Sequence, residues 1–192
     1  MPNQFATVLA SVSLAACSVV GVRSVEEPPS TVLDHVGAVE IRQYGERVAA
    51  QTVVDADVLA ARSAGFRRIA GYIFGGNRAQ ASIAMTAPVA QAAGEGGQVI
   101  QFFMPSSYAL GALPAPRDPA VQLVTAPAQA MAVLRFSGSI APDAVGAKQQ
   151  ALLDALRGSA WRADGAVVAW FYDPPWTLPP FRRNEVAVPV TR

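Results

Sequence analysis

Residues 66–89 read FRRIAGYIFGGNRAQASIAMTAPV, and residues 172–188 read YDPPWTLPPFRRNEVAV. The first stretch begins inside a predicted helix, because apolar residues up to Ile73 recur at helical spacing before the glycine pair 75–76 ends the pattern. Alternating side chains in 82–91 then indicate a strand. The second stretch joins a proline-rich turn to a short apolar segment, which predicts a loop followed by a strand.

The order of predicted elements occurs twice along the chain. In the first half, a β-type segment broken at Gly45 precedes a helix and two strands, at 39–54, 57–74, 82–91 and 98–104. In the second half the same order occupies 121–140, 142–157, 166–172 and 185–190. Neither half can bury both faces of a small sheet alone, so we predict that the two pair into one α+β domain.

The two helices have recognisable ends. Asp57 is a good N-cap for the first helix, and Pro142 suits the first turn of the second. Leucines 152, 153 and 156 form the apolar face of the second helix, which Gly158 should end. Each helix is therefore expected to lay one apolar stripe on the sheet.

The two opening stretches resemble the signatures of the SOUL haem-binding-protein family. Members carry a helix running into a Gly-Asn turn and a Met-Thr-Ala-Pro strand, then a Tyr-Asp-Pro-Pro loop leading into Arg-Arg-Asn-Glu-Val. The likeness extends over about residues 39–190. It implies a distorted antiparallel β-barrel of two pseudo-symmetric strand-helix-strand-strand repeats with two flanking helices, similar to the effector-binding domains of some bacterial regulators.

The resemblance also implies reversible binding of haem or a related tetrapyrrole. In the family, the ligand lies between the first helix and the loop before the last strand. The matching residues here are Phe66, Arg67, Ile69, Ala70, Ile73, Pro175, Trp176, Thr177, Leu178, Phe181 and Arg182. Apolar side chains would cover the faces of a flat macrocycle while an arginine pairs with a propionate. Alternatively, Trp176 and Phe181 simply close the core. Lysines assist propionate binding in some relatives, but Lys148 is the only lysine of this chain.

An axial iron ligand is not obvious. His35 is the only histidine and a weak candidate, because it precedes the part of the chain that resembles the family. The position that carries a proposed histidine ligand in some relatives is Gln43 here. Met85, Met104 and Met131 could offer sulfur, but their setting is more typical of core residues. No His, Cys and carboxylate cluster has metal-ligand spacing, so we expect no metal site.

The N-terminus has the features of a bacterial lipoprotein. Residues 5–16 form an apolar run that is shorter than the roughly 20 residues of a spanning helix and ends in Leu-Ala-Ala before Cys17. We predict a signal peptide at 1–16, a lipidated tether at 17–31 and the SOUL-like domain at 32–192. Acylation of Cys17 would anchor the protein in the cell envelope facing the periplasm, and Ser18 favours the outer membrane.

Composition limits the remaining function classes. The 192 residues are 52% hydrophobic and 15% charged with a net charge of +1, which excludes a disordered chain and makes nucleic acid a poor partner. No nucleophile or paired-acid motif is present, so we expect a binding protein rather than an enzyme. We also expect a monomer. The alternatives are an envelope interaction or scaffold protein of the same fold and a tetrapyrrole-modifying enzyme.

Overall fold

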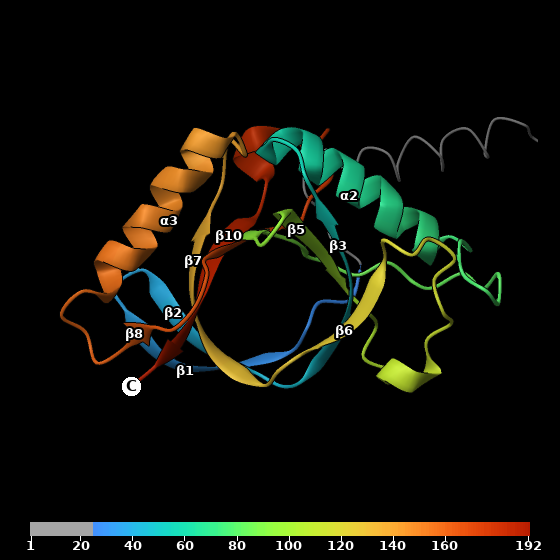
Figure 1. Cartoon of the computed structure of the whole chain (residues 1–192). Helices are drawn as coiled ribbons and strands as arrows, with labels where there is room; N and C mark the ends of the chain where they lie inside the picture. The colour runs from blue at the N-terminus through green and yellow to red at the C-terminus, as the bar shows by residue number, and fades with distance from the viewer. Residues whose placement is uncertain (1–24) are drawn as a thin grey trace, which may run out of the picture.

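The computed structural model describes residues 25–192, which form an α+β fold with a ten-stranded antiparallel sheet and two α-helices (Figure 1). This confirms the predicted fold class. The strands are β1 (Ser30–Val36), β2 (Val39–Tyr44), β3 (Arg47–Val54), β4 (Val89–Gly94), β5 (Gly97–Phe103), β6 (Gln122–Ala126), β7 (Gln129–Phe136), β8 (Arg162–Ala163), β9 (Val168–Phe171) and β10 (Asn184–Thr191). The helices are α2 (Val58–Ile73) and α3 (Pro142–Leu156), with short 3-10 turns η1 (Leu110–Ala112) and η2 (Pro179–Phe181).

The sheet mixes strands from both halves of the chain. Its order is β1-β2-β7-β10-β9-β4-β5-β3-β6, with β8 paired to β10. Strand β2 of the first half pairs with β7 of the second, and β9 of the second half pairs with β4 of the first. Figure 1 shows the sheet curling into a barrel-like ring with both helices outside it. Within residues 25–192 no ladder joins the end strands β1 and β6.

Both helices begin and pack as their sequences predict. The Asp57 carboxylate accepts hydrogen bonds from the backbone N–H groups of Leu59 and Ala60, both at 3.0 Å, and so caps α2. Helix α3 starts at Pro142, whose missing N–H costs nothing in a first turn. Its buried residues are Val145, Leu152 and Leu156.

The core has three parts. One part lies beneath α3 and contains Val39 and Ile41 of β2, and another lies beneath α2 and contains Ile100 and Phe102 of β5. The third part contains no helix residue and lies inside the curled sheet. It comprises Tyr44, Ala49, Ala87, Ala90, Phe103, Met131, Val133, Trp170, Tyr172 and Ala187. The interior of the barrel is therefore lined by strands and by residues next to them, Ala87 and Tyr172, without a contribution from the helices.

Two boundaries differ from the prediction. The strand expected at 82–91 forms a ladder only from Val89, because the preceding segment bonds outside the sheet, with the Ile83 and Ala87 N–H groups donating to the carbonyls of Ile73 and Glu26. The Asn77 side chain bonds the backbone of Tyr72 and Ala81, and the Thr86 hydroxyl donates to the Phe103 carbonyl. The sequence analysis also did not include β1 and β8.

The folded domain starts before residue 32. The Glu26 carbonyl accepts a 2.9 Å hydrogen bond from the Ala87 N–H, and Glu27 forms an ion pair with Arg183, so part of the predicted tether belongs to the domain. The predicted signal peptide and the lipidation site Cys17 lie outside the described residues. In the part that the structure describes, neither helix has the length and apolar character needed to cross a bilayer.

The contact between α2 and β5 can be tested with two glycines of the same helix. A Cβ atom at Gly65 would overlap the side chain of buried Ile100, whereas one at Gly71 would meet nothing within 4 Å. We expect Gly65→Ala to lower the free energy of unfolding by about 1–3 kcal/mol. Gly71→Ala should raise it by about 0.5–1 kcal/mol, because alanine is the better helix former. Urea unfolding of both variants measures this, and equal effects would contradict the tight helix–sheet contact.

Candidate functional site

Strand alternation sends polar side chains into the barrel interior. On β2, Val39 and Ile41 enter the core beneath α3, while Tyr44 on the opposite face joins the interior core. Glu40 and Arg42 share the face of Tyr44 because side chains two residues apart lie on one side of a strand. On β10, Ala187 belongs to the interior core, which places Glu185 on the interior face as well.

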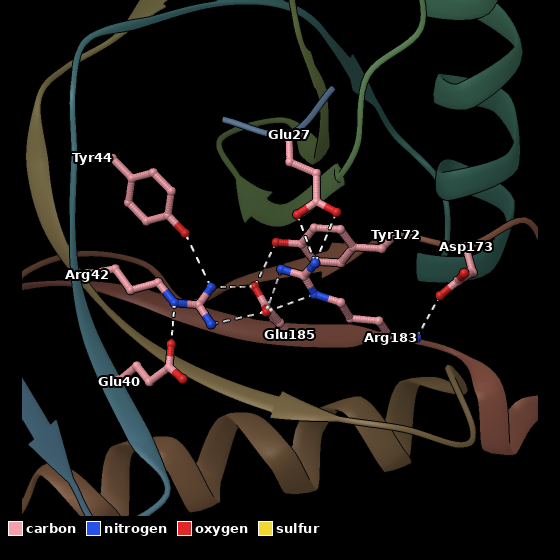
Figure 2. Close-up of polar contacts among 8 residues, drawn as sticks. All are labelled: Glu27, Glu40, Arg42, Tyr44, Tyr172, Asp173, Arg183 and Glu185. Carbon is pink, nitrogen blue, oxygen red and sulfur yellow. Dashed lines mark hydrogen bonds and ion pairs between the residues drawn. The ribbon is translucent and has the colours of Figure 1, made fainter. Parts of the chain in front are cut away.

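Glu185 is the centre of a charged network inside the barrel. Its side chain is 0% exposed and accepts hydrogen bonds from two arginines and a tyrosine. Arg42 Nη1 donates to Oε2 at 3.0 Å, Arg183 Nη2 donates to Oε1 at 3.1 Å, and the Tyr172 hydroxyl donates to Oε2 at 2.7 Å. Figure 2 shows the two guanidinium groups converging on this carboxylate. A buried charge is tolerated only when it is paired and hydrogen-bonded in this way.

Further pairs extend the network to the surface. Arg42 Nε donates to Glu40 at 2.7 Å, and Arg183 Nη1 donates to both carboxylate oxygens of Glu27 at 3.0 and 2.8 Å. We call Glu27, Glu40, Arg42, Tyr172, Arg183 and Glu185 the interior network. Burial, together with the charge of Glu185, raises the pKa of Tyr172, so its hydroxyl stays protonated and remains a donor.

Arg47, at the start of β3, lies beside the network without joining it. Its guanidinium packs over the rings of Tyr44 at 4.5 Å and Phe103 at 4.7 Å. Its Nε and Nη1 atoms are buried and have no hydrogen-bond partner among the described residues. Burial lowers the pKa of Arg47.

Two adjoining pockets meet at Arg47, and we call them together the interior hollow. The first has a volume of about 240 Å³ and includes Arg42, Tyr44 and Trp170 in its lining. The second has a volume of about 260 Å³ and extends over Met104, Pro105, Tyr108 and Leu110. Both are lined by Glu27, Pro28, Arg47 and Phe103.

This interior site was not predicted from the sequence. Its signal was the alternation in VEIRQY, where Glu40, Arg42 and Tyr44 occupy one face of a strand whose other face is apolar. Glu185 lies 143 residues from Arg42 in the sequence, and Glu27 lies 156 residues from Arg183. Separations of that size cannot be read from local patterns.

The predicted ligand residues on α2 divide between core and surface. Ile69, Ala70 and Ile73 are buried, and Ile69 and Ile73 belong to the core beneath the helix. Phe66 is partly exposed and packs against Phe102 with ring centroids 5.4 Å apart. Arg67 is exposed. Of this group, the residues on the surface are therefore Phe66 and Arg67.

The predicted ligand residues in the loop before β10 form an exposed apolar surface. Trp176, Leu178 and Phe181 are 64%, 49% and 51% exposed, and we call them the exposed loop face. Thr177 between them is fully buried. Arg182 stabilises the loop with two hydrogen bonds. Its Nε donates to the Thr177 carbonyl at 2.8 Å, and its Nη2 donates to the carbonyl of exposed Pro175 at 2.7 Å.

The helix and the loop both reach the segment 138–140. Arg62 of α2 donates from Nη1 to the Ile140 carbonyl at 3.1 Å, and the Gly138 N–H donates to the Pro179 carbonyl at 2.9 Å. Arg62 also covers the ring of Phe171 at 3.9 Å, and burial lowers its pKa to about 10. In Figure 1, η2 lies near the N-terminal end of α2.

The candidate iron ligands are dispersed. His35 is exposed on strand β1, and Gln43 lies on β2 with its amide donating to the Tyr44 carbonyl at 2.9 Å. Met104 and Met131 are buried in two different parts of the core. Over residues 25–192, no group of three or more His, Cys, Asp and Glu side chains could hold a metal ion.

The model of the SOUL heme-binding protein family matches residues 25–189, so the chain belongs to that family. No curated protein matches the sequence.

Solved structures of low sequence identity share the fold. The crystal structure of the EcmrR C-terminal domain is 10% identical, with a TM-score of 0.60 over 80% of this chain and 97% of that one. EcmrR in its complex with DNA is 10% identical with a TM-score of 0.62, covering 80% of this chain and 57% of that one. A hydrolase from Listeria innocua is 8% identical with a TM-score of 0.54, over 88% of this chain and 94% of that chain. At these identities the likeness shows the fold alone.

Removal of the central carboxylate tests the interior network. Glu185→Ala would leave Arg42 and Arg183 without the partner they share, so we expect the free energy of unfolding to fall by about 3–5 kcal/mol. The control Glu46→Ala changes an exposed glutamate beside the hollow and should stay within about 0.5 kcal/mol of wild type. Urea denaturation gives both values. An unfolding free energy for Glu185→Ala near that of wild type would show that the network is dispensable.

Proposed function

We propose that this protein binds haem or a related tetrapyrrole reversibly, on a surface formed by the exposed loop face and α2, and that it acts as a carrier rather than an enzyme. Membership of the SOUL heme-binding protein family supports the class of ligand. The observation that carries the location is the exposed loop face, in which Trp176, Leu178 and Phe181 are all about half exposed or more.

The construction of the loop supports a role in binding. Large apolar side chains gathered on a surface commonly mark an interaction site. This loop holds them in place through the two hydrogen bonds from Arg182 and the buried Thr177, so little order is lost when a ligand arrives. Aromatic and aliphatic side chains in such an arrangement suit the face of a flat macrocycle.

The charges near this surface favour weak binding. Arg67 on α2 is exposed and is the cation of the predicted set best placed to meet a propionate, whereas two donors of Arg182 already bind the loop. Covering about 350 Å² of macrocycle at about 25 cal/mol per Å² contributes about 9 kcal/mol. Association costs at least about 4 kcal/mol. The remainder corresponds to a dissociation constant of about 0.1 mM, which suits transfer or buffering better than storage.

Binding is also preferred to catalysis on chemical grounds. The side chains that we assign to this surface offer apolar area and one guanidinium, which orient a ligand but do not supply a nucleophile or a general base. A tetrapyrrole-modifying enzyme would change the pigment spectrum with time instead of shifting it once. The absorption spectrum of bound hemin, followed over time, separates these two outcomes.

Hemin titration tests the assignment. Adding hemin to the purified mature domain should shift the Soret band saturably, and Trp176→Ala should weaken binding by about tenfold, because a large aromatic contact is lost. The control is Phe74→Ala at the end of α2, since Phe74 is 64% exposed like Trp176 but lies outside the predicted set. Wild-type protein that leaves the band unchanged would refute tetrapyrrole binding and favour an envelope interaction protein. Equal losses in the two variants would refute the location.

We further propose that the protein is exported as a monomeric lipoprotein, anchored through Cys17 and facing the periplasm, with the outer membrane as its destination. The small residues before Cys17 and the serine after it support this. Cells fed labelled palmitate should incorporate label into the wild-type protein, which should sediment with membranes. Cys17→Ser should remain unlabelled and leave the membrane fraction. A labelled Cys17→Ser variant, or an unlabelled wild type, would contradict lipidation at this residue.

A further inference from the structure

The interior hollow contains a cation whose hydrogen-bonding capacity is unused. Nε and Nη1 of Arg47 are buried and lack hydrogen-bond partners, and no ion pair joins Arg47 to a carboxylate of residues 25–192. Buried donors of this kind are rare in folded proteins and call for an acceptor. An oxygen from outside the described chain is the natural candidate.

The neighbouring acidic side chains are bound elsewhere. Arg42 forms ion pairs with Glu40 and Glu185. Arg183 forms ion pairs with Glu27 and Glu185. Glu26 accepts a 2.8 Å hydrogen bond from the Ser106 N–H, which lowers the pKa of its carboxyl. The remaining acid of the lining, Glu46, is exposed. The carboxylates of the interior network are therefore paired within the network, and Arg47 can pair with a ligand.

The surroundings of Arg47 define what such a ligand carries. The guanidinium carbon of Arg47 lies 4.5 and 4.7 Å from the ring centroids of Tyr44 and Phe103, and Nε and Nη1 lack partners. A carboxylate can accept from either of these donors, or from Nη1 and Nη2 together with two parallel acceptors. It would also offset the burial that lowers the pKa of Arg47.

The second pocket defines the rest of the ligand. Beyond Arg47 its apolar and aromatic lining comes from Val48, Met104, Pro105, Tyr108 and Leu110, and its polar lining includes Glu26, Glu46, Thr86 and Ser106. Its volume of about 260 Å³ lies below the roughly 300–1,000 Å³ typical of pockets for drug-sized ligands. This pocket suits a small apolar body. The lining of the hollow contains none of the residues of the exposed loop face, so the two sites are separate.

We propose that the interior hollow binds a small organic acid, with its carboxylate on Arg47 and its aromatic or short aliphatic body in the second pocket. The carboxylate of Glu185 is paired with two arginines and hydrogen-bonded by a tyrosine, so it is not available to a cationic ligand in the hollow. The site goes beyond the tetrapyrrole surface proposed above and does not depend on it.

Protein with an unchanged hollow can show which charge the ligand carries. The full chain carrying Cys17→Ser would be titrated calorimetrically with benzoate, phenylacetate and hexanoate, and with the amide and amine counterpart of each. At least one acid should bind saturably and about tenfold or more tighter than its counterparts, as expected for charge-assisted hydrogen bonds. Amines that bind as tightly as the acids, or three acids that do not saturate, would overturn the proposal.

Substitution of Arg47 assigns the binding to the hollow. Arg47→Met should weaken the best acid about tenfold or more, while Arg78→Met, at an exposed arginine outside the hollow, should leave it unchanged. Circular dichroism checks folding, and if Arg47→Met does not fold, Arg47→Lys replaces it. Lysine keeps the charge but lacks the planar fork, so affinity should fall several-fold. Wild-type affinity in the folded Arg47 variant, or an equal loss in Arg78→Met, would refute the site.

Discussion

The burial of Glu185 is the constraint on which the barrel interior depends. A carboxylate with no exposed surface must be matched by donors, and here they come from both halves of the chain, since Arg42 belongs to β2 while Tyr172 and Arg183 flank the loop before β10. The same arrangement sets the register of β2, β7 and β10, because a shift by one residue would turn Arg42 and Glu185 towards the core beneath α3. Fold and interior charge are thus specified together.

The fold places two kinds of surface on different parts of one scaffold. The interior hollow has charged side chains around Arg47 and a mixed lining of apolar and polar side chains beyond it, and its walls are strands and the segments that join them. The exposed loop face lies on the turn that leads into β10. In this turn the Asp173 carboxylate accepts a hydrogen bond from the Arg183 N–H, and Arg182 donates to the Thr177 carbonyl. The two surfaces are linked just before β10, since Arg183 lines the hollow and the adjacent Arg182 supports the loop.

The sequence predicted the fold more fully than the site. Helical spacing, the Asp57 cap and the glycine ends located both helices, and the repeated order of elements predicted that the halves would pair. Segment 82–88 was predicted as a strand but lies outside the ladder, because the N–H groups of Ile83 and Ala87 donate to Ile73 and Glu26 and not to a neighbouring strand of the sheet. The interior network was missed because the pairs that bring the two halves together, Arg42–Glu185 and Glu27–Arg183, join residues more than 140 positions apart, whereas alternation on β2 shows only that polar residues face one side.

The entry of the chain into the domain has a mechanical consequence. Glu26 and Glu27 are among the first described residues, and they are fastened by the Ala87 N–H and by Arg183 beside the mouth of the hollow. Tension applied from the N-terminal side would therefore load this backbone hydrogen bond and this ion pair before any strand of the sheet. Pulling them away would widen the opening while the rest of the barrel kept its shape, which couples force on the chain to access to its interior.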